Sequence, residues 1–189
     1  MSAETHLWLI RHAPVDGPRG LIHGPDAPAD VSDAAAFAAL KARLPVNGLV
    51  LCSPARRTFE TALTLGLDPV KQVLFREQDF GAWTGRRHND LVAEPVGAYR
   101  EFWKSPASNA PPGGESFVDQ IGRTIDGLAP LPAGDVILVV HSGTIRAALA
   151  IALDLAPDAA LRFVIDPLSL TRIDRLENGW RVVAVNRRG

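Results

Sequence analysis

The sequence predicts an α/β fold in which three layers, α/β/α, contain a mostly parallel central sheet with an antiparallel edge. Two observations favour this fold class. Short apolar runs alternate along the chain with segments of helical periodicity, as expected when helices connect parallel strands. Near the C-terminus, Asn178-Gly179 separates two strand-like runs, and this dipeptide is a strong signal for a β-hairpin. We expect that hairpin to supply the antiparallel edge.

Length and composition indicate one globular domain over residues 1–189, large enough to bury a core. The formal net charge of −1 implies no general attraction to nucleic acid or to an anionic membrane, so neither is an expected partner. A single cysteine, Cys52, excludes an internal disulfide and a cysteine-based zinc cluster. We find no signal peptide and no apolar run long enough to span a bilayer, and therefore expect a cytoplasmic protein.

The first part of the chain predicts a strand, a long loop and a helix. Residues 6–11 form a short apolar run that is typical of a buried strand. Residues 13–30 are rich in proline and glycine and predict a loop, and loops of this length are usually functional or mobile. Residues 32–43 are rich in alanine, with Phe37 and Leu40 at helical spacing, and predict a helix.

A second strand and helix are expected next. Residues 49–53 are apolar and predict a strand that carries Cys52 into the core as a small apolar side chain. Proline is favoured in the first turn of a helix, so Pro54 indicates the start of a helix over residues 54–66. Residues 70–75 predict a further short strand, which would extend the sheet on this side.

The middle of the chain predicts a cap over the site. Residues 86–104 have helical character in two pieces that are separated at Pro95, because proline interrupts a helix. Residues 105–114 are rich in proline, alanine and serine and predict a loop. We interpret residues 86–115 as a helical cap insertion within the single domain rather than as a domain of their own.

The last part of the chain returns to alternating strands and helices. An amphipathic helix is expected over residues 116–128, followed by a buried strand over 136–141 and a helix over 144–154. The strands of the C-terminal hairpin are expected over residues 168–176 and 180–185.

Two of the predicted strands end on histidine. The first run leads into Arg11-His12, and the run that begins at Val136 ends at His141. Parallel strands place the residues just past their carboxyl ends on one rim of the sheet, where ligands bind. We therefore expect two imidazoles and a guanidinium in one pocket. That combination suggests phosphoryl transfer through a histidine nucleophile.

A more specific pattern is carried by four segments in a fixed order: Leu9–His12, Cys52–Ala62, Arg76–Gly85 and Val140–Arg146. Together they resemble the histidine phosphatase superfamily, also called the phosphoglycerate mutase-like family, over nearly the whole chain. The resemblance implies the phosphoglycerate mutase-like form of the α/β/α fold. Three further segments are similar to its α-ribazole phosphatase and broad-specificity phosphatase branch: Asp79–Gly85, Phe102-Trp103 and Pro111–Ser116.

The resemblance also implies roles for five residues in a metal-independent phosphatase. His12 would be the nucleophile, His141 would stabilise the transferred group in its protonated form, and Glu77 would be the general acid and base. Arg11 and Arg57 would clamp the phosphoryl oxygens, for which the planar guanidinium is suited. Because these side chains supply positive charge, we expect no metal and no other cofactor.

Further contacts to the substrate are expected from a helix start and from loops. Backbone N–H groups at a helix N-terminus bind anions, which predicts such a role for Ser142 and Gly143. The resemblance implies additional substrate contacts from Asp26, His23 and Glu115.

One departure from the family pattern bears on the function. The family usually continues after Arg-His with Gly, then Glu or Gln, then Thr, whereas this chain has Ala13-Pro14-Val15. Ala13 lacks the freedom of glycine at positive φ, and Pro14 lacks a backbone N–H. We expect a phosphomonoester hydrolase, a monomer or homodimer, acting on a small phosphorylated metabolite such as α-ribazole 5'-phosphate. The alternatives are a phosphoglycerate mutase-type phosphoryl transferase and a non-catalytic relative that binds a phospho-ligand.

Overall fold

The computed structural model describes residues 4–94 and 97–188. Its sheet has six strands: β1 (Thr5–Arg11), β2 (Leu49–Cys52), β3 (Val70–Lys71), β4 (Gly134–Val140), β5 (Leu170–Leu176) and β6 (Gly179–Arg187). They are arranged in the order β3-β2-β4-β1-β5-β6. The first four in this order are parallel, β5 is antiparallel to β1, and β6 is antiparallel to β5. The predicted fold class, with its antiparallel edge formed by the C-terminal hairpin, is confirmed.

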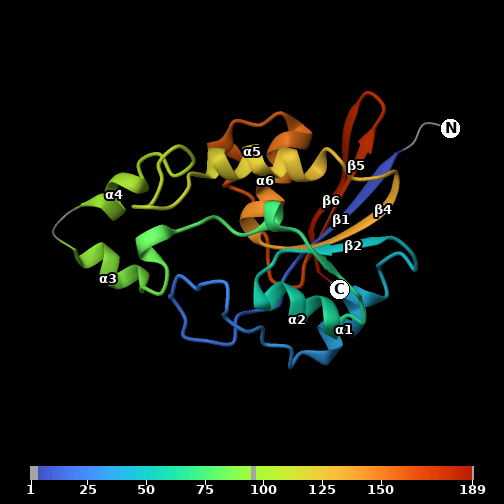
Figure 1. Ribbon diagram of the computed structural model, residues 1–189, viewed down its shortest axis with the longest axis horizontal. Helices are drawn as coiled ribbons and strands as arrows, with labels where there is room; N and C mark the ends of the chain where they lie inside the picture. Colours follow the sequence, from blue (N-terminus) through green and yellow to red (C-terminus); the bar gives the residue numbers. More distant parts are fainter. Residues whose placement is uncertain (1–3, 95–96, 189) are drawn as a thin grey trace.

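Helices cover both faces of the sheet (Figure 1). Helices α5 (Phe117–Leu128) and α6 (Ser142–Leu153) lie on one face, and α1 (Ala34–Lys41) and α2 (Arg56–Thr64) lie on the other. Each parallel strand is joined to the next through one of these helices, as a parallel sheet requires. The loops that follow β1, β2 and β4 therefore open at the same end of the sheet.

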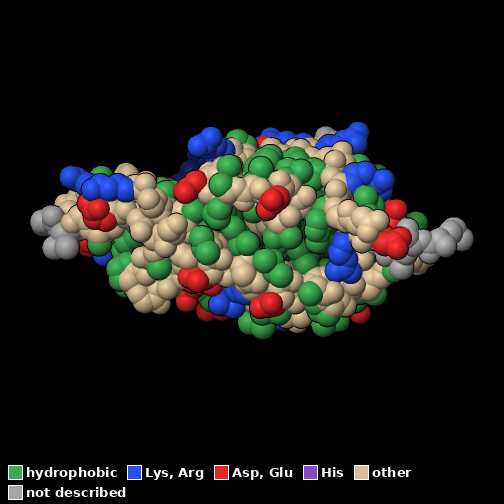
Figure 2. Space-filling view, turned by 90° about the horizontal axis from the view of Figure 1, so that it is seen from above, with side chains coloured by type: hydrophobic (Ala, Val, Ile, Leu, Met, Phe, Trp, Pro, Cys, Tyr) green, Lys and Arg blue, Asp and Glu red, His purple; other side chains and the backbone are tan. Residues whose placement is uncertain are grey.

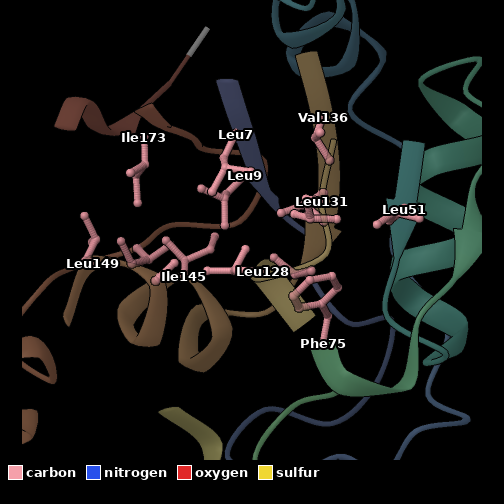
Figure 3. Packing of buried hydrophobic residues seen from close by; sticks show 14 residues of the cluster. Leu7, Leu9, Leu51, Phe75, Leu128, Leu131, Val136, Ile145, Leu149 and Ile173 are labelled. Atoms are coloured by element: carbon pink, nitrogen blue, oxygen red, sulfur yellow. The ribbon is translucent and has the colours of Figure 1, made fainter. Parts of the chain in front are cut away.

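The strands are buried on both faces, so successive side chains enter different core clusters. Leu7 and Leu9 of β1 pack with Ile145 and Leu149 of α6 in the cluster drawn in Figure 3. Ile10, the next residue of β1, belongs to the cluster on the opposite face beneath α1 and α2. This two-sided burial fixes the register of β1, because a slip of one residue would exchange the two faces.

The cap region forms a small third cluster. Helices α3 (His88–Ala93) and α4 (Ala98–Phe102) project from one end of the molecule (Figure 1). Trp83 is buried there, with its ring centroid 5.2 Å from that of Tyr99 and 5.3 Å from that of Phe102. Both helices fall within the predicted insertion, and Pro95, where we expected the break between them, lies outside the described residues.

The cap also contacts the long loop that follows β1. Leu21 in that loop forms an isolated antiparallel bridge with Arg87, at the start of the cap. The backbone N–H of Ile22 donates to the carbonyl of Arg86 at 2.9 Å. The loop and the cap are therefore joined by backbone hydrogen bonds, and together they enclose one side of the end of the sheet at which β1 stops.

Three short elements differ from the sequence prediction. The strand expected over residues 70–75 ends after Lys71 and continues as a short 3-10 helix, Val73–Phe75, because the Gln72 side chain accepts from the backbone N–H of Leu74. Two other short helices, Gly81–Trp83 and α7 (Pro157–Ala160), were not predicted. Segments of three or four residues are too short to show a helical period.

An apolar surface covers the layer of α5 and α6. Figure 2 views the molecule from this side and shows hydrophobic side chains gathered at its centre, with charged side chains mostly around them. Val118 and Ile125 of α5, Leu153 of α6 and Val164 are among the exposed large hydrophobic residues.

None of the helices in residues 4–94 and 97–188 is long and apolar enough to cross a membrane. The expectation that the protein is a monomer or a homodimer stays a prediction.

Candidate active site

Three parallel strands deliver the central residues of the site. The backbone N–H of His12, just past β1, donates to the carbonyl of Val140 at the end of β4, at 3.0 Å. Ser53, just past β2, donates to the carbonyl of Val139 at 3.1 Å. His12, Ser53 and His141 therefore stand side by side on one rim of the sheet. The ring centroids of the two histidines are 5.1 Å apart.

The orientation of His12 leaves one ring nitrogen available. Its Nδ1 lies 2.6 Å from the carbonyl oxygen of Ala13, which can only accept, so Nδ1 carries a proton. The other nitrogen, Nε2, is then unprotonated, and its lone pair accepts a hydrogen bond from Arg57. The side chain is almost fully buried, and its hydrogen bond to the next residue fixes the ring in this orientation.

Arg57 links the two histidines. It lies in the first turn of α2 and is 5% exposed. Its Nε donates to Nε2 of His12 at 3.2 Å, and its Nη2 lies 3.3 Å from Nδ1 of His141. Its Nη1 donates to the carbonyl of Gly24 in the long loop at 2.9 Å. The guanidinium thus occupies the space between the imidazoles, where an oxyanion would find both charge and donors.

His141 is held from both sides. It is the N-cap residue of α6, and its Nε2 lies 2.8 Å from Oγ of Ser53. Because Arg57 has only donors, Nδ1 of His141 accepts, and Nε2 carries the proton that is shared with Ser53. This is the neutral ring, whereas the sequence prediction was of a protonated His141.

Burial and positive charge account for the neutral rings. Burial lowers the pKa of His12 well below its ordinary value, and its neighbours His141 and Arg57 lower it further. Burial likewise lowers the pKa of His141 well below its ordinary value, with Arg57, Arg123 and Arg11 adding to the effect. Both imidazoles are therefore neutral near pH 7 in the free protein. A bound phosphate dianion would oppose these positive charges.

Arg11 offers an unused donor to the same space. Its Nη1 donates to the carbonyl of Ile165 at 2.5 Å, which fixes the guanidinium. Its Nε is buried and has no hydrogen-bond partner among the described residues. Burial lowers the pKa of Arg11, and the nearby carboxylate of Glu77 opposes this shift. An oxyanion in the cavity would satisfy this buried N–H group.

Glu77 lies beside His141 and lines the same cavity. Its Oε2 is 3.9 Å from Nδ1 of His141. Its Oε1 accepts from the backbone N–H of Gln78 at 3.1 Å and from Nε2 of Gln120 at 3.3 Å. Arg123 of α5 fixes the backbone by donating to the carbonyl of Glu77 at 3.1 Å. The carboxylate is thus held at the edge of the cavity by the backbone of Gln78 and by side chains of α5.

The cavity has a volume of about 520 Å³ and brings together most of the predicted residues. Of the predicted site, it is lined by Arg11, His12, His23, Arg57, Glu77 and Ser142. His141 is fully buried behind this lining. Further lining residues come from the loop that follows β1 and from residues in or near the cap: Val15, Leu21, Ile22, Pro25, Phe80, Thr84 and His88.

Three residues that we expected to contact the substrate do not line the cavity. Gly143 does not line the cavity; a Cβ at this position would meet Oε1 of Glu77, so the residue makes room for that carboxylate. Asp26 is exposed and does not line the cavity. Glu115 is bound by Arg123 and Arg76, at 2.5 Å and 3.3 Å, which hold its carboxylate away from the cavity.

Two polar residues of the site were not predicted. Ser53 follows a predicted strand in the same way as His12 does, and this position was the signal that could have identified it. Gln120 lies in the middle of an amphipathic helix and has no local signal. In residues 4–94 and 97–188, no group of three or more histidine, cysteine, aspartate or glutamate side chains is arranged to hold a metal ion.

The departure at residues 13–15 is accommodated without strain. Ala13 is fully buried, its backbone N–H donates to Oγ1 of Thr61 at 3.0 Å, and its φ is not positive. The carbonyl of Pro14 accepts from the N–H of Asp30 at 2.7 Å. Val15 lines the cavity, where its side chain adds apolar surface. Glycine is therefore not needed at position 13 by the backbone conformation of this chain.

Comparisons with known proteins agree with this geometry. Residues 7–188 match the family described as the histidine phosphatase superfamily (branch 1). A glucosyl-3-phosphoglycerate phosphatase of Mycolicibacterium vanbaalenii is 33% identical over 80% of this chain and 76% of that protein. An adenosylcobalamin/α-ribazole phosphatase of Escherichia coli is 28% identical over 89% of each.

Similarity extends to solved structures and to longer proteins. The structure of a putative α-ribazole-5'-phosphate phosphatase from Escherichia coli has a TM-score of 0.86 at 25% identity, covering 98% of this chain and 97% of that one. A bifunctional protein of Mycobacterium tuberculosis is 34% identical over 65% of this chain but only 35% of its own length. The chain thus spans about a third of the length of that relative and of two others with the same match.

Proposed function

This chain belongs to the histidine phosphatase superfamily (branch 1), and from that premise we propose that it hydrolyses a phosphomonoester through a phosphohistidine intermediate. The substrate would be a small phosphorylated metabolite. The observation that carries the proposal is the pairing of a neutral, buried His12 with a guanidinium that also contacts His141. A nucleophile with a free lone pair and a charged clamp for oxygens are what phosphoryl transfer requires.

In the first step, Nε2 of His12 attacks phosphorus. The lone pair forms the N–P bond, the ester P–O bond breaks, and its electron pair stays on the leaving oxygen. That oxygen takes a proton from Glu77, acting as general acid. Because Nε of Arg57 faces the same lone pair in the free protein, the guanidinium must exchange that contact for a phosphoryl oxygen as the substrate enters.

In the second step, water attacks phosphorus and Glu77 takes its proton. The N–P bond breaks, its electrons return to Nε2, and inorganic phosphate is released. Arg11 and Arg57 stabilise the charge on the transferred group in both steps, with Nε of Arg11 as a free donor, and His141 joins them when the bound phosphate dianion favours its protonated form. We propose that no metal ion takes part, since the two arginines already supply positive charge and donors.

The part of the cavity lining that comes from the loop and from residues near the cap favours an uncharged, partly apolar leaving group. Leu21, Ile22 and Phe80 supply apolar surface there, and His23 and His88 supply hydrogen-bonding groups. Apart from the two clamp arginines, Arg76 is the one arginine or lysine on the cavity lining among the described residues, and it is paired with Glu115. This composition favours an α-ribazole 5'-phosphate-like ester over one with a second anionic group.

The same composition weakens two other candidate functions, that of a mutase and that of a glucosyl-3-phosphoglycerate phosphatase, because their ligands carry a further negative charge. A mutase must hold a bisphosphate, and a glucosyl-3-phosphoglycerate carries a carboxylate. Either ligand would leave an anionic group facing largely apolar walls and Asp79, at a cost in desolvation.

Trapping of the intermediate tests the function. The protein would be mixed with ³²P-labelled aryl phosphate, quenched in alkali, and analysed for acid-labile, alkali-stable label. We expect label on the wild type, none on His12→Ala, and loss of steady-state turnover in that variant. Wild-type turnover should be retained after dialysis against EDTA, since the mechanism uses no metal.

Controls distinguish a wrong nucleophile from a wrong function. Circular dichroism of His12→Ala should match that of the wild type, because the residue lies at the rim of the sheet. Turnover that persists in the folded variant would contradict the assignment of His12. Tight phosphate binding by the wild type without turnover on a panel of neutral and anionic esters would instead support the non-catalytic alternative.

A further inference from the structure

We propose that Gln120 is a positioning residue that holds Glu77 in both of its protonation states. Its amide N–H would bind Oε1 in both states, which leaves Oε2 as the oxygen that carries the transferred proton. The inference rests on the proposed function, because it concerns the general acid and base of that reaction. It adds a residue outside the lining of the cavity to the machinery of the site.

The first observation is an unsatisfied atom next to Glu77. Gln120 lies in α5 and is fully buried. Its Nε2 donates to Oε1 of Glu77 at 3.3 Å and approaches the carbonyl of Arg76 at 3.5 Å. Its Oε1 has no hydrogen-bond partner among the described residues. A buried, unpartnered amide oxygen is costly, so its retention beside a proton-transferring group calls for a reason.

The second observation is that the surroundings fix the amide in this orientation. A Cβ built on Gly143 would lie 2.7 Å from Oε1 and 2.9 Å from Nε2 of Gln120, so the amide lies broadside against this glycine. A half-turn would place the amide oxygen against the carbonyl of Arg76 and the carboxylate of Glu77, both of which accept hydrogen bonds and cannot donate. The N–H group of the amide is therefore kept toward Glu77.

The chemistry of Glu77 explains why an uncharged donor is useful. The side chain is a carboxylic acid before the ester bond breaks and a carboxylate afterwards, until water returns a proton. With the transferred proton on Oε2, Oε1 accepts from the amide N–H in both states. A neutral amide therefore binds either form, whereas an arginine would favour the charged form.

The other charged groups around Glu77 do not duplicate this function. Positive charge comes from Arg11 on β1, Arg57 on α2 and Arg146 on α6, and His141 is 3.9 Å away. Arg123 of α5 binds the backbone carbonyl of Glu77, and Arg76 and Glu115 are paired with one another nearby. Among the described residues, Gln120 is the one side chain that donates a hydrogen bond to the carboxylate.

The test compares Gln120→Met with Thr124→Val. Thr124 is one turn further along α5 and equally buried, and its hydroxyl donates to the backbone carbonyl of Gln120 rather than to Glu77. We would measure kcat and KM from pH 5 to 9 for an alkyl phosphate, whose leaving group needs a proton, and for p-nitrophenyl phosphate, whose leaving group does not. Thermal unfolding would show that both variants are folded.

Gln120→Met should lower kcat for the alkyl ester by roughly 10- to 100-fold, the effect expected when a hydrogen bond to a charged group is lost. The aryl ester should lose only a few-fold, and KM should change little, because the phosphate clamp is intact. Thr124→Val should leave both esters within about twofold of wild type. A structural defect would lower both esters together.

Gln120→Glu supplies a readout that a structural role would not change. Two carboxyl groups within hydrogen-bonding distance share a proton to higher pH than one alone. The alkaline limb of the alkyl-ester kcat profile should therefore move to higher pH in this variant. Equal losses for both esters in Gln120→Met, or an unmoved limb in Gln120→Glu, would overturn the proposal while leaving the phosphatase function intact. Absence of wild-type turnover would overturn the function itself.

Discussion

Two adjacent arginines have opposite surroundings. Arg57 is buried and bonded to both imidazoles, whereas Arg56 is exposed and paired with Glu60 at 2.6 Å on the same helix. An exposed ion pair of this type contributes little to stability. A buried guanidinium that faces a phosphoryl group is worth much more, because it acts where water is excluded.

Arg57→Ala should therefore lower kcat/KM by about 10²- to 10³-fold, equivalent to ~3–4 kcal/mol of transition-state stabilisation. Since the charge of Arg57 lowers the pKa of both histidines, its removal should also move the acid limb of the pH profile to higher pH. Steady-state kinetics on an aryl phosphate measure both effects. Arg56→Ala is the matched control and should behave as the wild type; similar losses in the two variants would contradict the clamp.

The residues of the clamp could be predicted from sequence because they follow strands or begin a helix. Arg11, His12 and His141 come directly after apolar runs, so the topology of a parallel sheet brings them together. Gln120 could not be predicted, since it meets Glu77 across 43 residues of sequence and only after α5 has docked. The substrate contact expected of Glu115 stays a prediction: Arg123, two turns further along, binds its carboxylate, and Glu115 does not line the cavity.

At the scale of elements, the side chains that pack against the first turn of α6 limit which residues can stand there. His141 caps the helix, and Gly143 in its first turn faces the carboxylate of Glu77 and the amide of Gln120. Thr144 then ties the helix to the segment before Glu77 by donating to the carbonyl of Phe75 at 3.2 Å. The first turn of α6 therefore sets the distance between the carboxylate of Glu77 and the imidazoles.

Gly143→Ala should displace Glu77 and lower kcat for alkyl phosphates by roughly 10- to 100-fold, a part of what general acid catalysis contributes. The protein should remain folded, because the side-chain end of Glu77 can move. Gly122→Ala is the control: Gly122 is exposed in α5 with no atom near a new Cβ. It should raise the free energy of unfolding by about 1 kcal/mol without changing kcat. Unchanged alkyl-ester kinetics in Gly143→Ala would show that the contact is unimportant.

The longer elements could be predicted closely because each has a clear period or apolar run. Strand β1 and helix α6 lie within two residues of their predicted limits. The segment 70–75 was the main error among the strands. Its apolar residues suggest a strand, but Phe75 is fully buried in the cluster under α5 and α6, and the chain turns to reach that position. Tertiary packing decided its conformation, as it often does for short segments.

At the scale of the whole molecule, the site adds a pH dependence to the stability of the fold. Both imidazoles are buried, and the pKa of each lies below its value in an unfolded chain. Below about pH 6.5, the unfolded chain binds protons at these positions that the folded chain does not. The free energy of unfolding must then decrease as the pH falls from neutral toward the lowered pKa values.

Urea unfolding in a phosphate-free buffer at pH 7.5, 6.5 and 5.5 measures this effect. We expect the wild type to lose stability across this series. The double variant His12→Gln/His141→Gln should lose less over the same interval, whatever its stability at pH 7.5, because it has fewer groups that gain protons on unfolding. Parallel pH dependence in the two proteins would mean that these histidines do not govern acid sensitivity.

The loop after His12 closes on itself at its base. The N–H of Asp30 donates to the carbonyl of Pro14, the N–H of Asp16 donates to the carbonyl of Pro28 at 3.0 Å, and Val15 forms a bridge with Ala29. Residues 14–30 therefore leave and rejoin the body of the protein at one point, and changes near the tip of the loop need not disturb the strand before it or the helix after it. Much of the wall that faces the leaving group belongs to this loop. Exchange of the whole loop between relatives is thus a route by which evolution, or a protein engineer, can change the range of accepted esters while inheriting the phosphoryl-transfer chemistry unaltered.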